Sequence, residues 1–203
     1  MKLSKKGEYA LRSLINLGIA QEMKHKLVQA SELAENEQLP VKFLEQILQA
    51  LKEAGIVASE RGKFGGYRLA RPARKIFIGE VVRLIDGPLA PIGCVSQTAY
   101  EPCTCPDEAH CGLRMLMVDV RNAIADILDR YTLADVVEIT LRKMRRDSVS
   151  LPFSAEGASG AQPARIPARM ARQQLARRRR PSRATRNTPS EGVLHHILGE
   201  YTI

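Results

Sequence analysis

The four cysteines of the 203-residue chain all fall within 18 consecutive positions. They form the pattern C-x8-C-x-C-x5-C, made of Cys94, Cys103, Cys105 and Cys111. Thiolates bind iron–sulfur clusters or zinc, and a loop interrupted by proline and glycine lets several sulfur atoms converge on one centre. Zinc is the weaker option, because the paired C-x2-C knuckles of structural zinc sites are missing. A reversible thiol–disulfide switch, or cysteines without any ligand role, are the other interpretations.

A second group of residues suits contact with nucleic acid. An amphipathic helix expected over 41–52 exposes side chains that can reach base edges in a major groove: Lys42, Glu45, Gln46 and Gln49. Further along, Arg61 could enter a minor groove or hold phosphate, and Lys63 and Arg68 could hold phosphate. The competing interpretation is a module that contacts protein through an ordinary solvated polar face.

Hydrophobic periodicity predicts the elements that position these side chains. Apolar residues recur at steps of three and four over 4–23, which indicates a first helix. A short helix over 32–38 is expected with Ser31 as its N-cap, and Pro40 suits the start of the next helix. Two helices with a tight connection, the second amphipathic, indicate a helix-turn-helix.

A β-hairpin is expected directly after these helices. Two strand-like runs, 56–60 and 67–70, flank a tip at 61–66 that is rich in glycine and positive charge. A hairpin in this position is the wing of a winged helix. The fold class is therefore mainly α with a small β-hairpin.

The second half predicts a short helix over 79–85, the cysteine loop over 88–112 and then a long helix. Apolar residues of the long helix follow one another at spacings of 4, 3, 4, 3 and 4, a heptad seam of Leu113, Met117, Val120, Ile124, Ile127 and Tyr131. Such a seam packs against its own domain or pairs with its copy in a second subunit. We favour a homodimer, because sequence-specific DNA-binding proteins are commonly two-fold dimers on palindromes. A capping box over 132–135 opens a last helix.

Charge is unevenly distributed along the chain. Residues 1–75 carry 14 basic and 8 acidic side chains, whereas residues 76–147 carry 8 and 11. Residues 148–203 carry 9 arginines and 3 glutamates and too few apolar residues to bury a core, which predicts a disordered tail. Its run Arg177–Arg180 would add nonspecific DNA affinity or do nothing. The basic first part indicates a module that binds a polyanion.

Other classes of protein are not favoured. No apolar run approaches the length of a membrane span, and no apolar run follows the charged N-terminus as in a secretory signal. A cytoplasmic location is expected, where disulfides are rare. No nucleophile–base signature, phosphate-binding glycine pattern or H-E-x-x-H motif is present, so an enzyme is not expected.

Several runs, in this order and at these separations, resemble the Rrf-two family of bacterial winged-helix regulators: 4–10, 43–48, 51–57, 61–62 and 65–69. The resemblance spans about residues 1–145. It implies homodimers with crossed long helices and, in many members, an iron–sulfur cluster held by three cysteines in the loop before the long helix.

The resemblance also implies a ligand set. Cys94 takes the place of the family's first cysteine, and Cys105 and Cys111 match the second and third. Cys103 is an additional thiol, so Cys103, Cys105 or both would ligate. Some members use a histidine three residues after the last cysteine, where this chain has Arg114. Others use an acidic residue from the partner's first helix, and Glu8 occupies that place. Either the four cysteines close the site or Glu8 completes it across the dimer.

We therefore expect four parts: a winged-helix DNA-binding domain (1–87), a cluster-binding loop (88–112), a dimerisation helix with a terminal helix (113–147) and a tail (148–203). The expected function is a transcriptional regulator, with repression as the expected sign, on a palindromic double-stranded DNA operator. A [2Fe–2S] or [4Fe–4S] cluster would report iron–sulfur, redox or nitric-oxide status. The alternative is a cluster-free, thiol- or metal-dependent regulator that acts through a protein partner.

Overall fold

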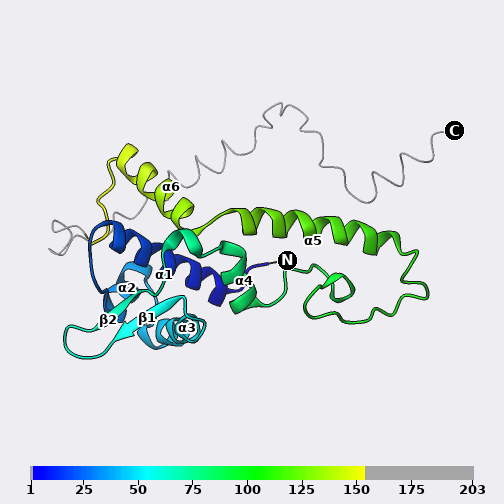
Figure 1. The fold of residues 1–203 in the computed structure, drawn as a ribbon, viewed down its shortest axis with the longest axis horizontal. Coiled ribbons are helices and arrows are strands. Elements are labelled where there is room, and N and C mark those ends of the chain that lie inside the picture. The colour runs from blue at the N-terminus through cyan, green and yellow to red at the C-terminus, as the bar shows by residue number, and fades with distance from the viewer. Residues whose placement is uncertain (1, 154–203) are drawn as a thin grey trace, which may run out of the picture. The chain divides into compact units, whose positions relative to one another are not determined.

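A computed structural model describes residues 2–153 of the chain (Figure 1). Its described part contains six α-helices and one two-stranded sheet, which confirms the predicted fold class. In chain order the elements are α1 (Lys5–Glu22), α2 (Ala30–Glu37), α3 (Val41–Glu53), β1 (Val57–Glu60), β2 (Gly66–Leu69), α4 (Ile78–Asp86), α5 (Gly112–Arg130) and α6 (Leu133–Arg146), with short 3-10 turns η1 (Ala73–Lys75) and η2 (Gly93–Val95). None of these helices is long and apolar enough to cross a lipid bilayer.

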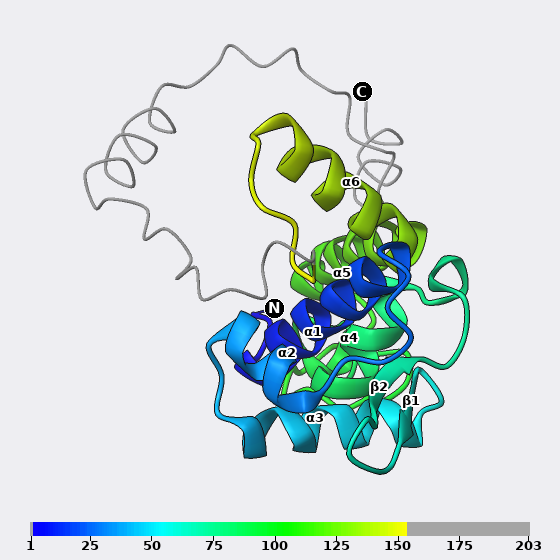
Figure 2. The same cartoon turned by 90° about the vertical axis from the view of Figure 1, so that its left-hand side faces the viewer.

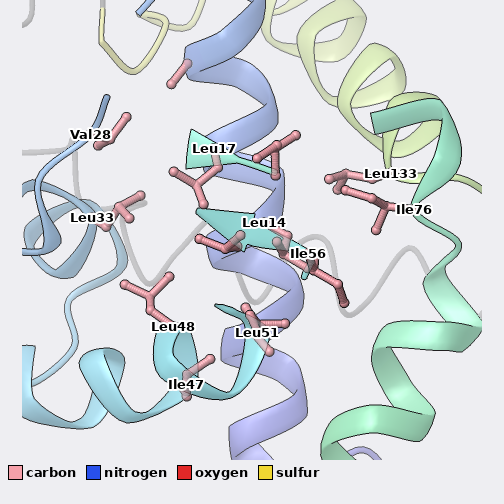
Figure 3. Close-up of a cluster of buried hydrophobic side chains, with 14 of the residues drawn as sticks. Leu14, Leu17, Val28, Leu33, Ile47, Leu48, Leu51, Ile56, Ile76 and Leu133 are labelled. Atoms are coloured by element: carbon pink, nitrogen blue, oxygen red, sulfur yellow. The ribbon is translucent and has the colours of Figure 1, made fainter. Parts of the chain in front are cut away.

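The main core surrounds α1, which supplies Leu14 and Leu17 to its centre (Figure 3). The apolar side of α3 faces it through side chains that are completely buried: Leu44, Ile47, Leu48 and Leu51. An edge-to-face contact between Tyr9 of α1 and Phe43 of α3, with ring centroids 5.9 Å apart, adds to this packing. The buried stripe predicted for the second helix of the helix-turn-helix is confirmed.

The start of α2 differs from the prediction. The helix begins at Ala30 with Gln29 as its N-cap, so Ser31 lies in the first turn and the prediction of Ser31 as the cap was wrong. The cause is tertiary: Val28 is held in an extended conformation by a bridge to Tyr67 of β2. The chain leaves this bridge already positioned to turn into a helix two residues later.

The hairpin β1–β2 lies beside α3 (Figure 2). Its antiparallel register places Val57 opposite Leu69 and Glu60 opposite Gly66. Gly66 also passes very close to the extended segment before α2, because a Cβ atom there would be 2.6 Å from the carbonyl oxygen of Val28. A side chain at this position would push the wing away from the body.

In the second half of the chain, helices α4 and α6 both pack against α1. Arg83 of α4 donates two hydrogen bonds to the carboxylate of Asp129 of α5, at 2.7 and 2.6 Å. The predicted capping box at the start of α6 is confirmed, since the Thr132 amide donates to the Asp135 carboxylate at 2.8 Å and the Asp135 amide donates to the Thr132 hydroxyl.

Residues 148–153, the first of the predicted disordered tail, pack against the body. Leu151 and Phe153 are partly buried against the main core, and the Phe153 carbonyl oxygen lies 2.7 Å from Nε2 of His25. The rest of that predicted tail, including Arg177–Arg180, lies outside the described residues.

Because Leu14 is completely buried at the centre of the core, Leu14→Ala should lower the free energy of unfolding by about 2–5 kcal/mol. Leu84→Ala is the matched control: this α4 residue is 42% exposed, and its truncation should cost less than about 1 kcal/mol. Urea unfolding at one fixed protein concentration measures both. Equal losses in the two variants would contradict a core centred on α1.

Candidate functional site

The four cysteines line one hollow of about 250 Å³ at the start of α5. Cys94 is buried in η2, and Cys111 is the N-cap residue of α5. Cys103 is half-buried and Cys105 is exposed, and all four thiols are free. The chain thus brings together the four residues that the sequence singled out, from three segments around the same space.

The thiols perturb one another strongly. Hydrogen bonding and negative charge at Cys103, and next at Cys111, raise the pKa of Cys105 to about 11. Burial, and then the neighbouring Cys103, raise the pKa of Cys94. Thiols gathered so closely resist ionisation, because each thiolate would repel the next. A bound metal cation reverses this preference, since its charge stabilises coordinating thiolates.

Polar neighbours hold the loop around the hollow. Glu108 accepts a hydrogen bond from the Tyr100 hydroxyl at 2.7 Å, and one of its oxygens lies 3.0 Å from Nε of Arg114. Cys103 is 3.8 Å from the same carboxylate. On the other side, Arg121 of α5 donates to the Val95 carbonyl at 2.7 Å and so fixes η2.

Glu8 lies elsewhere in the same chain. It is on α1, where its carboxylate is 2.8 Å from the Lys5 ammonium and 3.6 Å from the Arg12 guanidinium. The hydrogen bond from Lys5 lowers the pKa of Glu8. Glu8 does not line the thiol hollow, so only Glu8 of a second copy could act as a ligand there.

Within residues 2–153, no three His, Cys, Asp or Glu side chains are close enough to hold a single metal ion. The four cysteine thiols nevertheless line one hollow. Thiolates of this kind hold iron–sulfur clusters, and the paired C-x2-C spacing usual for structural zinc sites is missing from the sequence. The donor set therefore fits an iron–sulfur cluster.

The predicted DNA-facing side chains of α3 lie on its outer face. Lys42, Glu45, Gln46 and Gln49 are all exposed, opposite the buried stripe of the same helix. Gln49 donates a hydrogen bond to Glu53, one turn further along, at 2.8 Å. The side chains of the other three have no hydrogen-bond or ion-pair partner within the described part of the chain and are free to contact a ligand.

The wing exposes all three of the predicted cations. Arg61 and Lys63 lie at the tip, and Arg68 lies within β2, where it pairs with Glu60 at 3.4 Å. Phe64, which sequence reasoning missed, is 84% exposed next to Lys63, whose ammonium lies 5.7 Å from the centroid of the Phe64 ring. An aromatic residue at the tip of a glycine-rich hairpin cannot reach the core, and this signal could have identified it.

Helix α5 contains no buried residue. Of the predicted seam, Leu113, Val120, Ile127 and Tyr131 are exposed, and so is Leu116, which the heptad pattern had left out. Ile124 behaves differently, since it packs against a small core of Ile78, Val82 and Leu89. One side of α5 therefore packs against the core of its own chain, and an apolar stripe next to that side is exposed to solvent.

The comparisons with known proteins agree with this architecture. The model of the Rrf2 family, described as iron-dependent transcriptional regulator, matches residues 3–139. An Rrf2-like HTH-type transcriptional regulator from Rhodobacter capsulatus is 42% identical over 139 residues, which cover 66% of this chain and 91% of the relative.

Two solved structures extend the likeness. The global cysteine regulator CymR of Bacillus subtilis is 30% identical with a TM-score of 0.57, over 68% of this chain and 98% of CymR. IscR of T. potens is 29% identical with a TM-score of 0.51, over 80% of this chain and 94% of IscR. The relatives are DNA-binding transcriptional regulators rather than enzymes. With the winged helix, the long helix and the matched residues in agreement, the chain belongs to the Rrf2 family of transcriptional regulators.

Proposed function

We propose that the protein is a homodimeric repressor that reads a palindromic operator through α3 and the wing. The observation that carries this proposal is the outer face of α3, where four polar side chains are exposed while the opposite face is completely buried. Glutamine and lysine on such a face can make hydrogen bonds to base edges in a major groove. Arg61 and Lys63 at the wing tip would add phosphate or minor-groove contacts.

The uncovered stripe of α5 supports a second copy of the chain as the partner. Leu116, Val120 and Ile127 lie on one side of the helix, and Ile127 is 54% exposed. An apolar stripe that is left in water is unfavourable, and pairing with its own copy around a two-fold axis would bury it. The same symmetry would present two α3 helices to two operator half-sites.

We propose that the thiol hollow holds an iron–sulfur cluster and that residues 88–112 form the sensor loop. Cys94, Cys105 and Cys111 are the three assigned ligands, with Cys103 or Glu8 of a second copy as the fourth. A bound cluster would supply a centre that is sensitive to iron supply, oxidation and nitric oxide. The gathering of all four thiols around one space supports this assignment.

Residues of the cysteine loop would connect ligation of the thiols to the position of α5. Cys111 is the N-cap of that helix, and Arg121 binds the η2 turn that contains Cys94. Ligation of the thiols would therefore restrain the loop at the start of α5 and fix the spacing of two reading helices. Release of that restraint would shift the population that can bind DNA.

A second candidate is a thiol switch without a cluster that regulates through a protein partner. Cys105 is exposed, and it is within hydrogen-bonding reach of both Cys103 and Cys111. Oxidation could join it to either neighbour and change the shape of the loop in the same place.

Anaerobic purification followed by iron and acid-labile sulfide analysis tests the cluster. The wild-type protein should be coloured and contain both elements, and Cys94→Ser should lose them.

Comparing Cys103→Ser with Glu8→Gln identifies the fourth ligand, because only the variant at the ligand should lose iron. Tyr100→Phe is the control, since it changes the loop without removing a thiol. A colourless wild-type protein would contradict the cluster, and a loss of two mass units per disulfide on oxidation would then support the thiol switch.

Reading of bases by α3 predicts a loss of sequence discrimination in Gln46→Ala. Affinity for an operator selected from random sequences should fall by about 1–3 kcal/mol, while affinity for random DNA changes little. Lys63→Gln should weaken both alike and reduce the salt slope by about one. Fluorescence anisotropy at several salt concentrations measures these effects, with Arg142→Gln on α6 as the matched charge control. If the ratio of operator affinity to random-DNA affinity is unchanged in Gln46→Ala, base recognition by Gln46 of α3 is contradicted.

The α5 interface predicts that Val120→Asp converts the dimer into a monomer. A buried carboxylate in an apolar interface should weaken association by roughly 3 kcal/mol or more. Asn122→Asp introduces the same carboxylate at an exposed polar position of the same helix and should leave the dimer intact. Sedimentation analysis separates the two cases. If both variants remain dimeric, the copies meet through another surface.

A further inference from the structure

A second hollow, of about 320 Å³, lies at the base of the wing. Its walls come from the end of α1, the segment 25–28 and the chain from Tyr67 to Pro72. This volume is at the lower end of the range for small-molecule sites, which is about 300–1,000 Å³. Leu17 and Val28 give it an apolar floor.

The charged side chains that line this hollow are all basic. They are Lys26, Arg68 and Arg71, with the imidazole of His25 beside them, and no acidic residue lines it. Glu60 and Glu80, which pair with Arg68 and Arg71, are not part of its lining. Lys26 has no ion-pair partner within residues 2–153. The hollow therefore favours an anion.

Arg71 adds a second observation. Its Nη2 pairs with Glu80, but its Nε is buried without a hydrogen-bond partner among the described residues. A buried donor without a partner is costly, so this guanidinium keeps hydrogen-bonding capacity that Glu80 does not use. Because Arg71 also lines the hollow, a carboxylate there could accept a hydrogen bond from it.

We propose that the hollow binds a small organic carboxylate. The carboxylate pairs with Arg71 and Lys26, and the apolar part of the ligand lies on Leu17 and Val28. Recognition thus combines a charge-assisted hydrogen bond with the burial of a short apolar group.

An occupant would act directly on the wing. Val28 and Tyr67 exchange both of their backbone hydrogen bonds, at 3.0 and 2.8 Å, and Tyr67 belongs to β2, the strand that directly follows the wing tip. A ligand that bridges α1 and β2 would fix the position of the tip relative to α3. Binding of a carboxylate in the hollow does not depend on the proposed function. Only the effect of that binding on DNA affinity rests on the proposed function.

Titration of the isotope-labelled full chain with benzoate, followed by amide NMR shifts, tests the binding. Benzamide is the matched neutral probe, because it has the same ring and nearly the same shape. Benzoate should shift the amides of Leu17, Val28 and Tyr67, and benzamide should bind at least about tenfold more weakly. Equal binding of the two probes, or benzoate shifts confined to other residues, would overturn the proposal.

Variants separate the hollow from general attraction to a basic protein. Lys26→Gln and Arg71→Gln should each weaken benzoate binding at least about fivefold, whereas Arg142→Gln, with the same change of charge on α6, should not. Ala70→Leu fills the mouth of the hollow from an exposed position without any change of charge and should also weaken it. If Arg71→Gln fails to fold, Lys26→Gln and Ala70→Leu still decide. Equal losses in Lys26→Gln and Arg142→Gln would show nonspecific attraction and overturn the site.

This titration contains no DNA and reports only on the hollow, so its result is independent of the proposed regulation. Operator affinity with and without saturating benzoate then tests the coupling to the wing. A chain that binds benzoate in the hollow but no operator would leave the site standing and remove the proposed function.

Discussion

The burial of α1 is the constraint on which the rest of the structure depends. This helix contacts α2, α3, β2, α4 and α6, so it joins the half that carries the reading face to the half that leads to the cysteines. Close packing is possible because Gly18 faces Val137 of α6, where a Cβ atom would be 2.5 Å from a methyl group. The two halves therefore share one hydrophobic core that is built around α1.

A continuous set of contacts links the thiol hollow to the reading helix. Arg121 connects η2 to α5, and the Arg83–Asp129 pair connects α5 to α4. Helix α4 packs on α1, and the Tyr9–Phe43 ring contact leads from α1 to α3. Each step is a packed or hydrogen-bonded contact rather than a flexible linker. Such continuity permits energetic coupling between the two sites, and only variants along it can measure that coupling.

Local patterns predicted the elements well, because helix periodicity, capping boxes and turn residues act over a few positions. The buried stripe of α3 and the capping box at Thr132 are examples. Features set by distant contacts were not predictable in this way. The extended Val28 moved the start of α2 away from Ser31, and the packing of Ile124 on α4 divided the expected seam of α5.

In the candidate sites too, local patterns were predictable from the sequence and features set by distant contacts were not. The spacing of the cysteines indicated a thiol centre, but it could not show that all four side chains would surround one space. Residue type indicated Arg68 as an exposed cation of the wing, but it could not show that Glu60 pairs with this side chain across the hairpin. The hollow at the base of the wing could not be foreseen, because its walls combine residues 17–28 with residues 67–72, which are far apart in the sequence.

The hydrogen bond from Arg121 to the Val95 carbonyl has a mechanical consequence. The cysteine loop is attached to α5 twice, once at Cys111 and again ten residues later at Arg121, and these points are about 15 Å apart along the helix axis. The segment 95–111 is thus held at both ends by one and the same helix. While the hydrogen bond holds, the cysteine loop and α5 move together, so a dimer paired through α5 would carry both cysteine loops with its interface helices.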